Sequence, residues 1–180
     1  LDHWILAKLN LLIKRVTDHL EKYEITEAGR KLQEFVNDLS TWYVRRSRDR
    51  FKKDGNDKEA ALATLAHVLT TVAQLFAPFT PFVAEKIYQE INGHREIRKT
   101  SDRGDLTSAT NSVHMSDWPK SQKQLINEKL LEQMERARRV VSLALEERSR
   151  ASMPVRQPLG NLKIKNSALE PEILGIIRDE

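Results

Sequence analysis

A chain of 180 residues is long enough for one domain with a complete hydrophobic core and a small appendage. It contains no cysteine, which excludes disulfides and thiolate metal sites, and no apolar run approaches the ~20 residues of a membrane span. Charged residues make up 31% of the chain and there are only six glycines, a composition that favours helices. The net charge is only +4, so a function that needs strong positive charge must concentrate it locally.

The first 53 residues carry the pattern of two helices. In the first, from an N-cap at Asp2 to about Leu20, apolar residues recur every three to four positions. The second is predicted to run without interruption from an N-cap at Thr26 to about Lys53. Its apolar face is predicted to comprise Leu32, Phe35, Val36, Leu39 and Tyr43.

Positive charge gathers in the basic segment, residues 42–53, which holds six basic residues against one acid, a charge of +5. Arginine suits phosphate because its planar fork can donate two parallel hydrogen bonds. The neighbouring rings of Trp42 and Tyr43 either stack on bases or, as part of the core, support the arginines. The segment is therefore a candidate nucleic-acid surface. Its basic residues are Arg45, Arg46, Arg48, Arg50, Lys52 and Lys53.

A solvated helix end is the alternative interpretation of the basic segment, because positive charge at a helix C-terminus complements the helix dipole. On a regular helix Arg46 and Arg50 continue the apolar face. Acids of a neighbouring helix could therefore anchor these two arginines instead of phosphates. Arg45, Arg48 and Lys52 lie on the opposite side of the helix, and both interpretations stay open.

Two further helices are predicted on either side of a proline elbow. The third follows a loop at Gly55, has Asp57 as its N-cap and ends before Pro78. The fourth begins at Pro81, where the missing N–H of proline costs nothing. The inner face is predicted to be Leu62, Leu65, Leu69, Val72 and Phe76 on the third helix and Val83, Ile87 and Ile91 on the fourth.

Helical periodicity disappears in residues 93–121, which are predicted to form a long polar loop. Its last part, residues 113–119, regains apolar side chains and is expected to pack back onto the bundle. His114 lies near Asp117 in the sequence, but no nucleophile or third partner is in register with them. We therefore expect no acid–base chemistry there.

The C-terminal part of the chain is predicted to be a fifth helix, residues 122–150, followed by the start of a small α+β unit. In that unit, residues 162–165 alternate like a strand, and a brief helix runs from Pro171 to about Arg178. A lone strand is not stable, so we expect the chain to be a piece of a longer protein. The predicted fold class is an all-α bundle of about five long helices. The predicted domains are the bundle, residues 1–150, and a truncated α+β appendage, residues 151–180.

Motifs for catalysis are missing from the sequence. It contains no glycine-rich phosphate loop, no Gly-x-Ser-x-Gly and no His-Glu-x-x-His, and its five histidines show no metal-ligand spacing. We therefore expect this chain to hold no catalytic residue, metal site or cofactor of its own.

Four stretches resemble segments of one known protein family, in the same order along the chain. Residues 37–48, Asn-Asp-Leu-Ser-Thr-Trp-Tyr-Val-Arg-Arg-Ser-Arg, resemble the second bundle helix of isoleucyl-tRNA synthetases. Residues 75–85, Leu-Phe-Ala-Pro-Phe-Thr-Pro-Phe-Val-Ala-Glu, resemble an elbow shared by class I synthetases for branched aliphatic amino acids. Residues 112–119, Ser-Val-His-Met-Ser-Asp-Trp-Pro, and 155–159, Val-Arg-Gln-Pro-Leu, resemble two further segments of the isoleucyl enzymes.

This resemblance implies a helical anticodon-binding domain that grips the anticodon stem and loop of isoleucine-accepting tRNA. It would position the tRNA for ATP-dependent aminoacylation by a catalytic domain of the same polypeptide. The family's His-Ile-Gly-His and Lys-Met-Ser-Lys-Ser motifs, editing domain and cysteine-bound zinc sites have no counterpart here. ATP, Mg²⁺ and zinc are therefore expected only elsewhere in a longer enzyme, which we expect to be a cytoplasmic monomer without a membrane partner.

Two alternatives to this function stay open: the anticodon-binding domain of a valyl- or leucyl-tRNA synthetase, and a non-catalytic helical module that docks on an acidic protein. Within the leading interpretation, the segment at Arg156 and Gln157 either hydrogen-bonds bases or braces its own turn. The candidate tRNA-binding residues are Trp42, Arg45, Arg46, Arg48, Arg50, Lys52, Lys53, Arg156 and Gln157.

Overall fold

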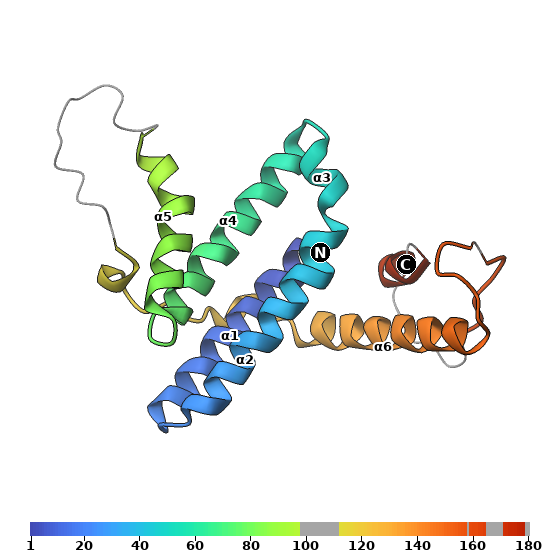
Figure 1. Ribbon diagram of the computed structural model, residues 1–180, viewed down its shortest axis with the longest axis horizontal. Helices are drawn as coiled ribbons and strands as arrows, with labels where there is room; N and C mark the ends of the chain where they lie inside the picture. The colour runs from blue at the N-terminus through green and yellow to red at the C-terminus, as the bar shows by residue number, and fades with distance from the viewer. Residues whose placement is uncertain (98–111, 158, 165–170, 179–180) are drawn as a thin grey trace. The chain divides into compact units, whose positions relative to one another are not determined.

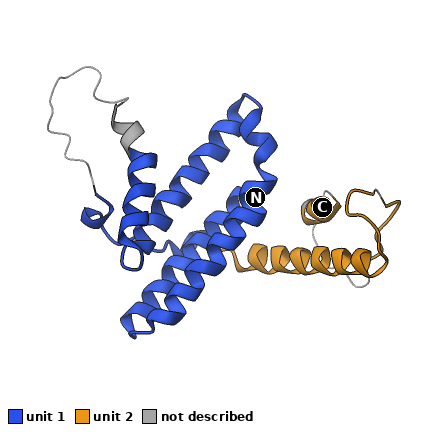
Figure 2. Cartoon of the chain, viewed as in Figure 1, with its two compact units in different colours: residues 1–126 blue, residues 127–180 orange. Residues whose placement is uncertain are grey.

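The described part of the chain is built from helices, as predicted, and contains no β-strand. It divides into two compact units, residues 1–126 and residues 127–180 (Figure 2). The boundary between the units lies at residues 126 and 127, before the helix that was assigned to the first domain. The predicted domain boundary at residues 150 and 151 stays a prediction. The computed structural model describes residues 1–97, 112–157, 159–164 and 171–178 (Figure 1).

Unit 1 consists of two helical hairpins. The first pairs α1 (Asp2–Glu21) with α2 (Ile25–Asp38), and the second pairs α4 (Asn56–Phe76) with α5 (Pro81–Ile97) (Figure 1). The hairpins join because α4 packs against both α1 and α2. The largest fully buried side chains of this unit are Ile5, Leu9, Val16, Leu32, Phe35, Tyr43, Val68 and Leu75.

The second predicted helix is helical along its length but is not one regular helix. After α2 the chain forms a π-helix, η1 (Leu39–Val44), and then a short helix, α3 (Arg48–Lys52). A π-helical turn holds an extra residue, so the side chains beyond it are rotated relative to a continuous α-helix. Ser47, four residues after Tyr43, is fully buried, and the adjacent Arg46 is half-buried.

Two predicted helix faces are partly wrong. On α4 the fully buried positions include Ala61 and Val68, while Leu62 is 44% exposed. This helix is apolar nearly all round, so periodicity does not single out one face. Among the described helices, α4 is also the one that is long and apolar enough to cross a membrane, but the core helices of soluble proteins meet the same criterion. On α5, Val83 is exposed and Ala84 is buried, because the small side chain lies at the contact with its neighbours.

The predicted N-caps Asp2, Thr26 and Asp57 are also wrong. α1 is capped by Leu1, α2 by Glu24, and α4 by Gly55, whose φ of 138° suits a residue without a Cβ. None of these caps makes a side-chain hydrogen bond to the helix. Asp2 and Asp57 instead lie in the first turn of α1 and α4, where their carboxylates are free to bind other groups.

The elbow between α4 and α5 is confirmed, since α4 ends at Phe76 and α5 begins at Pro81. The predicted loop at 93–121 is wrong at its start, because α5 continues to Ile97. Its middle, residues 98–111, lies outside the described residues.

The end of that loop packs back onto unit 1, as predicted. Val113, in a 3-10 turn η2 (Val113–Met115), is buried, and its N–H donates to Glu85 Oε2 at 2.9 Å. The Ser112 hydroxyl donates to the same carboxylate oxygen at 2.9 Å. Trp118 Nε1 donates to Thr17 Oγ1 at 2.9 Å. Sequence-distant helices therefore hold this segment by specific side-chain bonds.

Unit 2 contains α6 (Glu128–Arg150) and α7 (Pro171–Arg178), which pack together. α6 begins later than predicted, after a 3-10 turn η3 (Lys123–Leu125), and Asn127 caps it by accepting a bond from the backbone N–H of Leu130 at 3.0 Å. α7 spans the predicted residues. The predicted strand is wrong, since residues 162–164 are irregular and Lys165 lies outside the described residues. No partner strand exists in the described part of the chain to pair with it.

Candidate nucleic-acid interface

One arginine of the basic segment is held inside a cluster that we call the Arg50 clamp, formed by Arg50, Asp2, Asp57 and Tyr43. Arg50 Nη1 and Nη2 donate to the two carboxylate oxygens of Asp2, both at 2.7 Å. Arg50 Nε and Nη2 also donate to Asp57, at 2.7 to 3.1 Å. The hydroxyl of the fully buried Tyr43 donates to Asp2 Oδ1 at 2.8 Å. The clamp therefore ties together α1, η1, α3 and α4.

The electrostatics of the clamp follow from these bonds. Hydrogen bonds from Arg50 hold the pKa values of Asp2 and Asp57 below their usual value of 3.8. Burial raises the pKa of Tyr43, and the bond to Asp2 adds to this rise. One guanidinium thus faces two ionised carboxylates. For Arg50 the structure favours the alternative interpretation, in which acids of neighbouring helices anchor the side chain.

Four other cations of the basic segment are exposed, and we call them the exposed basic face: Arg45, Arg48, Lys52 and Lys53. Arg48 and Lys53 make no ion pair or side-chain hydrogen bond within the described residues. Lys52 Nζ lies 4.0 Å from Asp49, but both side chains are more than three-quarters exposed, so this pair is weak. Arg45 Nε donates to the backbone carbonyl of Thr41 at 2.8 Å.

The remaining candidates of the basic segment are half-buried. Trp42, in η1, and Arg46 each make an interaction within the fold. Tyr43 is fully buried, which confirms its predicted place on the apolar face and removes it as a stacking platform. Apart from Asp49, the exposed side chains of this segment are therefore four of its six cations and none of its aromatic rings.

Arg156 and Gln157 lie in unit 2, on a turn that another arginine holds. The Arg148 guanidinium donates to the backbone carbonyls of Pro154, Val155 and Gln157 at 2.9 to 3.2 Å. Sequence reasoning missed Arg148 as a site residue. A signal existed, because no acid lies three or four positions from it on the helix. The side chains of Arg156 and Gln157 are themselves exposed, so the brace does not depend on them.

An open cavity of about 680 Å³ lies beside this turn, within unit 2. Its walls are aliphatic side chains of α6, α7 and residues 155–164, and its lining includes three arginines and no acid. Gln157 and Asn161 add amide groups to the lining. Such a cavity can take up a planar uncharged group between aliphatic walls while donors at its edge bind polar atoms.

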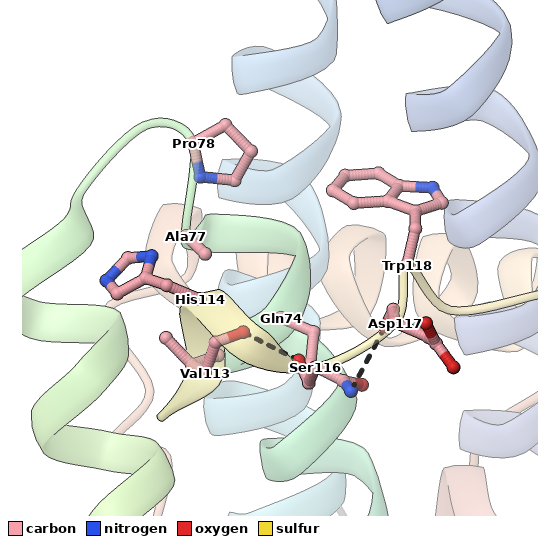
Figure 3. A pocket seen from close by; sticks show the side chains of 8 residues that line it. All are labelled: Gln74, Ala77, Pro78, Val113, His114, Ser116, Asp117 and Trp118. Atoms are coloured by element: carbon pink, nitrogen blue, oxygen red, sulfur yellow. Dashed lines mark hydrogen bonds between the residues drawn. The ribbon is translucent and has the colours of Figure 1, made fainter. Parts of the chain in front are cut away.

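A smaller cavity of about 290 Å³ in unit 1 contains the neighbouring pair His114 and Asp117 (Figure 3). The imidazole and the carboxylate point in different directions, and both residues are exposed (Figure 3). The hydroxyl of Ser116 donates to the carbonyl of Val113 at 2.6 Å, so it is not aligned with the histidine as a nucleophile. Over the described residues, no three His, Asp or Glu side chains gather as metal ligands.

An all-α fold that presents a concentrated cationic face defines a helical binding domain for a polyanion. The chain belongs to the family described as the anticodon-binding domain of tRNA ligase, whose model matches residues 2–165. This confirms the resemblance seen in the sequence.

Isoleucine–tRNA ligases are similar to this chain over nearly its whole length. The enzyme of Clostridium tetani is 40% identical over 183 residues and 100% of this chain. The enzyme of Thermus thermophilus is 44% identical over 176 residues and 96% of the chain, and that of Dehalococcoides mccartyi 42% over 180 residues and 99%. The chain spans only 16% to 17% of the length of these relatives. The two alternatives, a valyl- or leucyl-type domain and a protein-interaction module, are therefore not favoured.

Proposed function

We propose that the exposed basic face binds the sugar–phosphate backbone of the anticodon stem and loop of isoleucine-accepting tRNA. The observation that carries this proposal is the exposure of four cations within nine residues, of which Arg48 and Lys53 have no partner in the described part of the chain. Contacts to phosphate set position and register rather than sequence. Trp42 and Arg46, which are half-buried, support the face from inside the bundle.

In this proposal, Arg156 and Gln157 recognise the bases of the anticodon loop. RNA bases are recognised mainly when they are unstacked, by hydrogen bonds to their edges. Both side chains are exposed beside a cavity wide enough for a planar group, and Arg148 keeps their turn in place. Bracing the turn was the alternative role for Arg156 and Gln157, and Arg148 makes the bonds that this role needs.

The chain would act as one domain of a longer isoleucine–tRNA ligase. A catalytic domain of the same polypeptide would use ATP, Mg²⁺ and isoleucine, and zinc would be held elsewhere in that enzyme. This is supported by the names of the relatives and by the small share of their length that the chain spans. A cytoplasmic monomer without a membrane partner completes the proposal.

The test replaces Arg48, Lys52 and Lys53 by Ala in one variant and measures its affinity for isoleucine-accepting tRNA over a range of salt. Each phosphate contact contributes about 0.7 to 0.9 to the slope of log K against log salt, so the slope should fall by about 2 to 3. Thermal stability should stay within about 0.5 kcal/mol, because the three side chains are exposed.

A matched control removes three cations elsewhere: Lys86, Arg136 and Arg150, each paired with a glutamate on its own helix. This variant loses the same charge and should keep the slope of the wild-type chain. An unchanged slope in the first variant would show that the exposed basic face is not the tRNA surface. Competition by valine- and leucine-accepting tRNAs, and by an acidic peptide, tests the specificity and the two alternatives.

A further inference from the structure

The helix α3, which carries Arg48 and Lys52 of the exposed basic face, is too short to keep its conformation and orientation without contacts from other elements. α3 has only five residues, far fewer than an isolated helix needs in water, and none of them is fully buried. It is bounded by a turn at Ser47 and by the extended Lys53. Arg48 and Lys52 lie on this helix and Lys53 follows it directly. Their common surface therefore depends on contacts from outside the helix.

Arg50 supplies such contacts. Its planar guanidinium makes five hydrogen bonds, two to Asp2 on α1 and three to Asp57 on α4. Bidentate pairing fixes the orientation of the guanidinium plane as well as its position. Tyr43 donates to the Asp2 oxygen that accepts from Arg50 Nη1, and so holds the carboxylate in turn. Both aspartates lie in the first turn of a helix, where the dipole favours negative charge.

The net charge of the clamp excludes a simple attraction to phosphate. One guanidinium and two carboxylates sum to −1, so the clamp as a whole opposes a polyanion. Asp2 side-chain exposure is 25%, that of Arg50 is 22%, and both are already engaged in the pair. Any contribution of the clamp to tRNA binding must therefore come through geometry.

We propose that Arg50 is a positioning residue: clamped by Asp2 and Asp57, it fixes α3 so that Arg48, Lys52 and Lys53 meet the phosphates of tRNA as one surface. This inference rests on the proposed function. It assigns to the two acids a role in binding a polyanion that their charge alone would oppose.

The negative charge of the clamp makes a clear test possible. When one of its acids is removed, electrostatics and positioning predict opposite changes in the affinity for tRNA. Asp57→Asn and Asp2→Asn each remove a negative charge close to the exposed basic face, so electrostatics alone predicts unchanged or tighter binding of tRNA. Positioning predicts weaker binding, by about fivefold at low salt, which corresponds to about 1 kcal/mol. Affinities are measured by fluorescence anisotropy with labelled isoleucine-accepting tRNA, at a temperature where circular dichroism shows each variant folded.

The matched control is Asp54→Asn. Asp54 lies between α3 and α4, three residues before Asp57, is exposed, and pairs with Lys58 at 2.8 Å rather than with Arg50. Its variant loses the same charge with the clamp intact and should bind tRNA as tightly as the wild-type chain or slightly more tightly. Arg50→Lys adds a second comparison, because lysine keeps the charge but loses the bidentate fork; its affinity should also fall about fivefold.

Folding does not obscure the result. The Asp57 side chain is 70% exposed, so Asp57→Asn is expected to fold even if Asp2→Asn does not. Folded Asp57→Asn that binds tRNA as tightly as the wild-type chain, or more tightly, overturns the positioning role while leaving the proposed function intact. Loss of salt-dependent tRNA binding in the wild-type chain itself would instead reject the proposed function.

Discussion

Each unit of this chain uses one arginine to hold an irregular or short segment, but the two arginines bind different acceptors. In unit 1, Arg50 binds the carboxylates of Asp2 and Asp57. In unit 2, Arg148 binds three backbone carbonyls around Gln157. Carboxylates cancel the charge of a guanidinium, whereas carbonyls leave it positive. Two arginines thus contribute differently to a binding surface, because the acceptor determines whether the positive charge of the guanidinium remains available to a polyanion.

The largest effect is expected from breaking the charged clamp. Arg50→Ala leaves the partly buried Asp2 without its cation and should lower the free energy of unfolding by about 2 kcal/mol. The exposed Arg48→Ala is the matched control and should change it by no more than about 0.5 kcal/mol. Urea unfolding followed by circular dichroism measures both. Equal midpoints for the two variants would show that the clamp adds nothing to stability.

A smaller and more local effect is expected in unit 2. Arg148→Lys replaces a planar fork by a compact ammonium, which cannot reach three carbonyls with the same geometry. The loss should be about 1 kcal/mol or less, and hydrogen exchange at the Gln157 amide, now bonded to Pro154, should quicken. Arg150→Lys, which alters a surface pair with Glu146, should leave that amide protected. Unchanged exchange in Arg148→Lys would contradict the brace.

The smallest expected effect is a dependence of stability on pH, which should be present for the carboxylate-bound arginine and absent for the carbonyl-bound one. The pKa of Asp2 is lowered in the folded chain, so the stability that Asp2 contributes is fully present above about pH 3.8 and is lost as the pH falls through its lowered pKa. The stability difference between wild type and Asp2→Asn should therefore stay constant from pH 7 to about pH 4 and shrink below it. Carbonyls do not titrate, so the difference for Arg148→Lys should not change. Thermal unfolding in a pH series checks both, and parallel behaviour of the two variants would contradict the distinction.

Punctuation by proline was the most reliable structural signal in the sequence. Pro81 and Pro171 begin α5 and α7 where predicted, because proline fixes φ and its missing N–H is tolerated in the first turn. The aspartate signals failed for a different reason. Asp2 and Asp57 were assigned as caps from their local sequence, but both carboxylates bind the guanidinium of Arg50.

Helix faces were predictable only where polar residues interrupt the apolar pattern. The helical pattern correctly predicted that Leu32 and Phe35 in α2 and Leu39 at the start of η1 are buried, although Val36 is 39% exposed. In α4 alanine and leucine surround the helix, so neighbouring helices decided which side is covered. The strand predicted at residues 162–165 is wrong at the described residues 162–164, because a strand needs a paired neighbour that the local sequence cannot supply.

Local features of the sequence were enough to show that this chain is helical, that its positive charge is concentrated in residues 42–53, and that it resembles anticodon-binding domains, since propensity, composition and motifs are local properties. Which of those cations face solvent depends on how the helices pack. The π-helix at η1 rotates the side chains that follow it, and Arg50 meets residues 48 positions before it and seven positions after it. Such pairing depends on distances between folded helices, which no local pattern in the chain encodes.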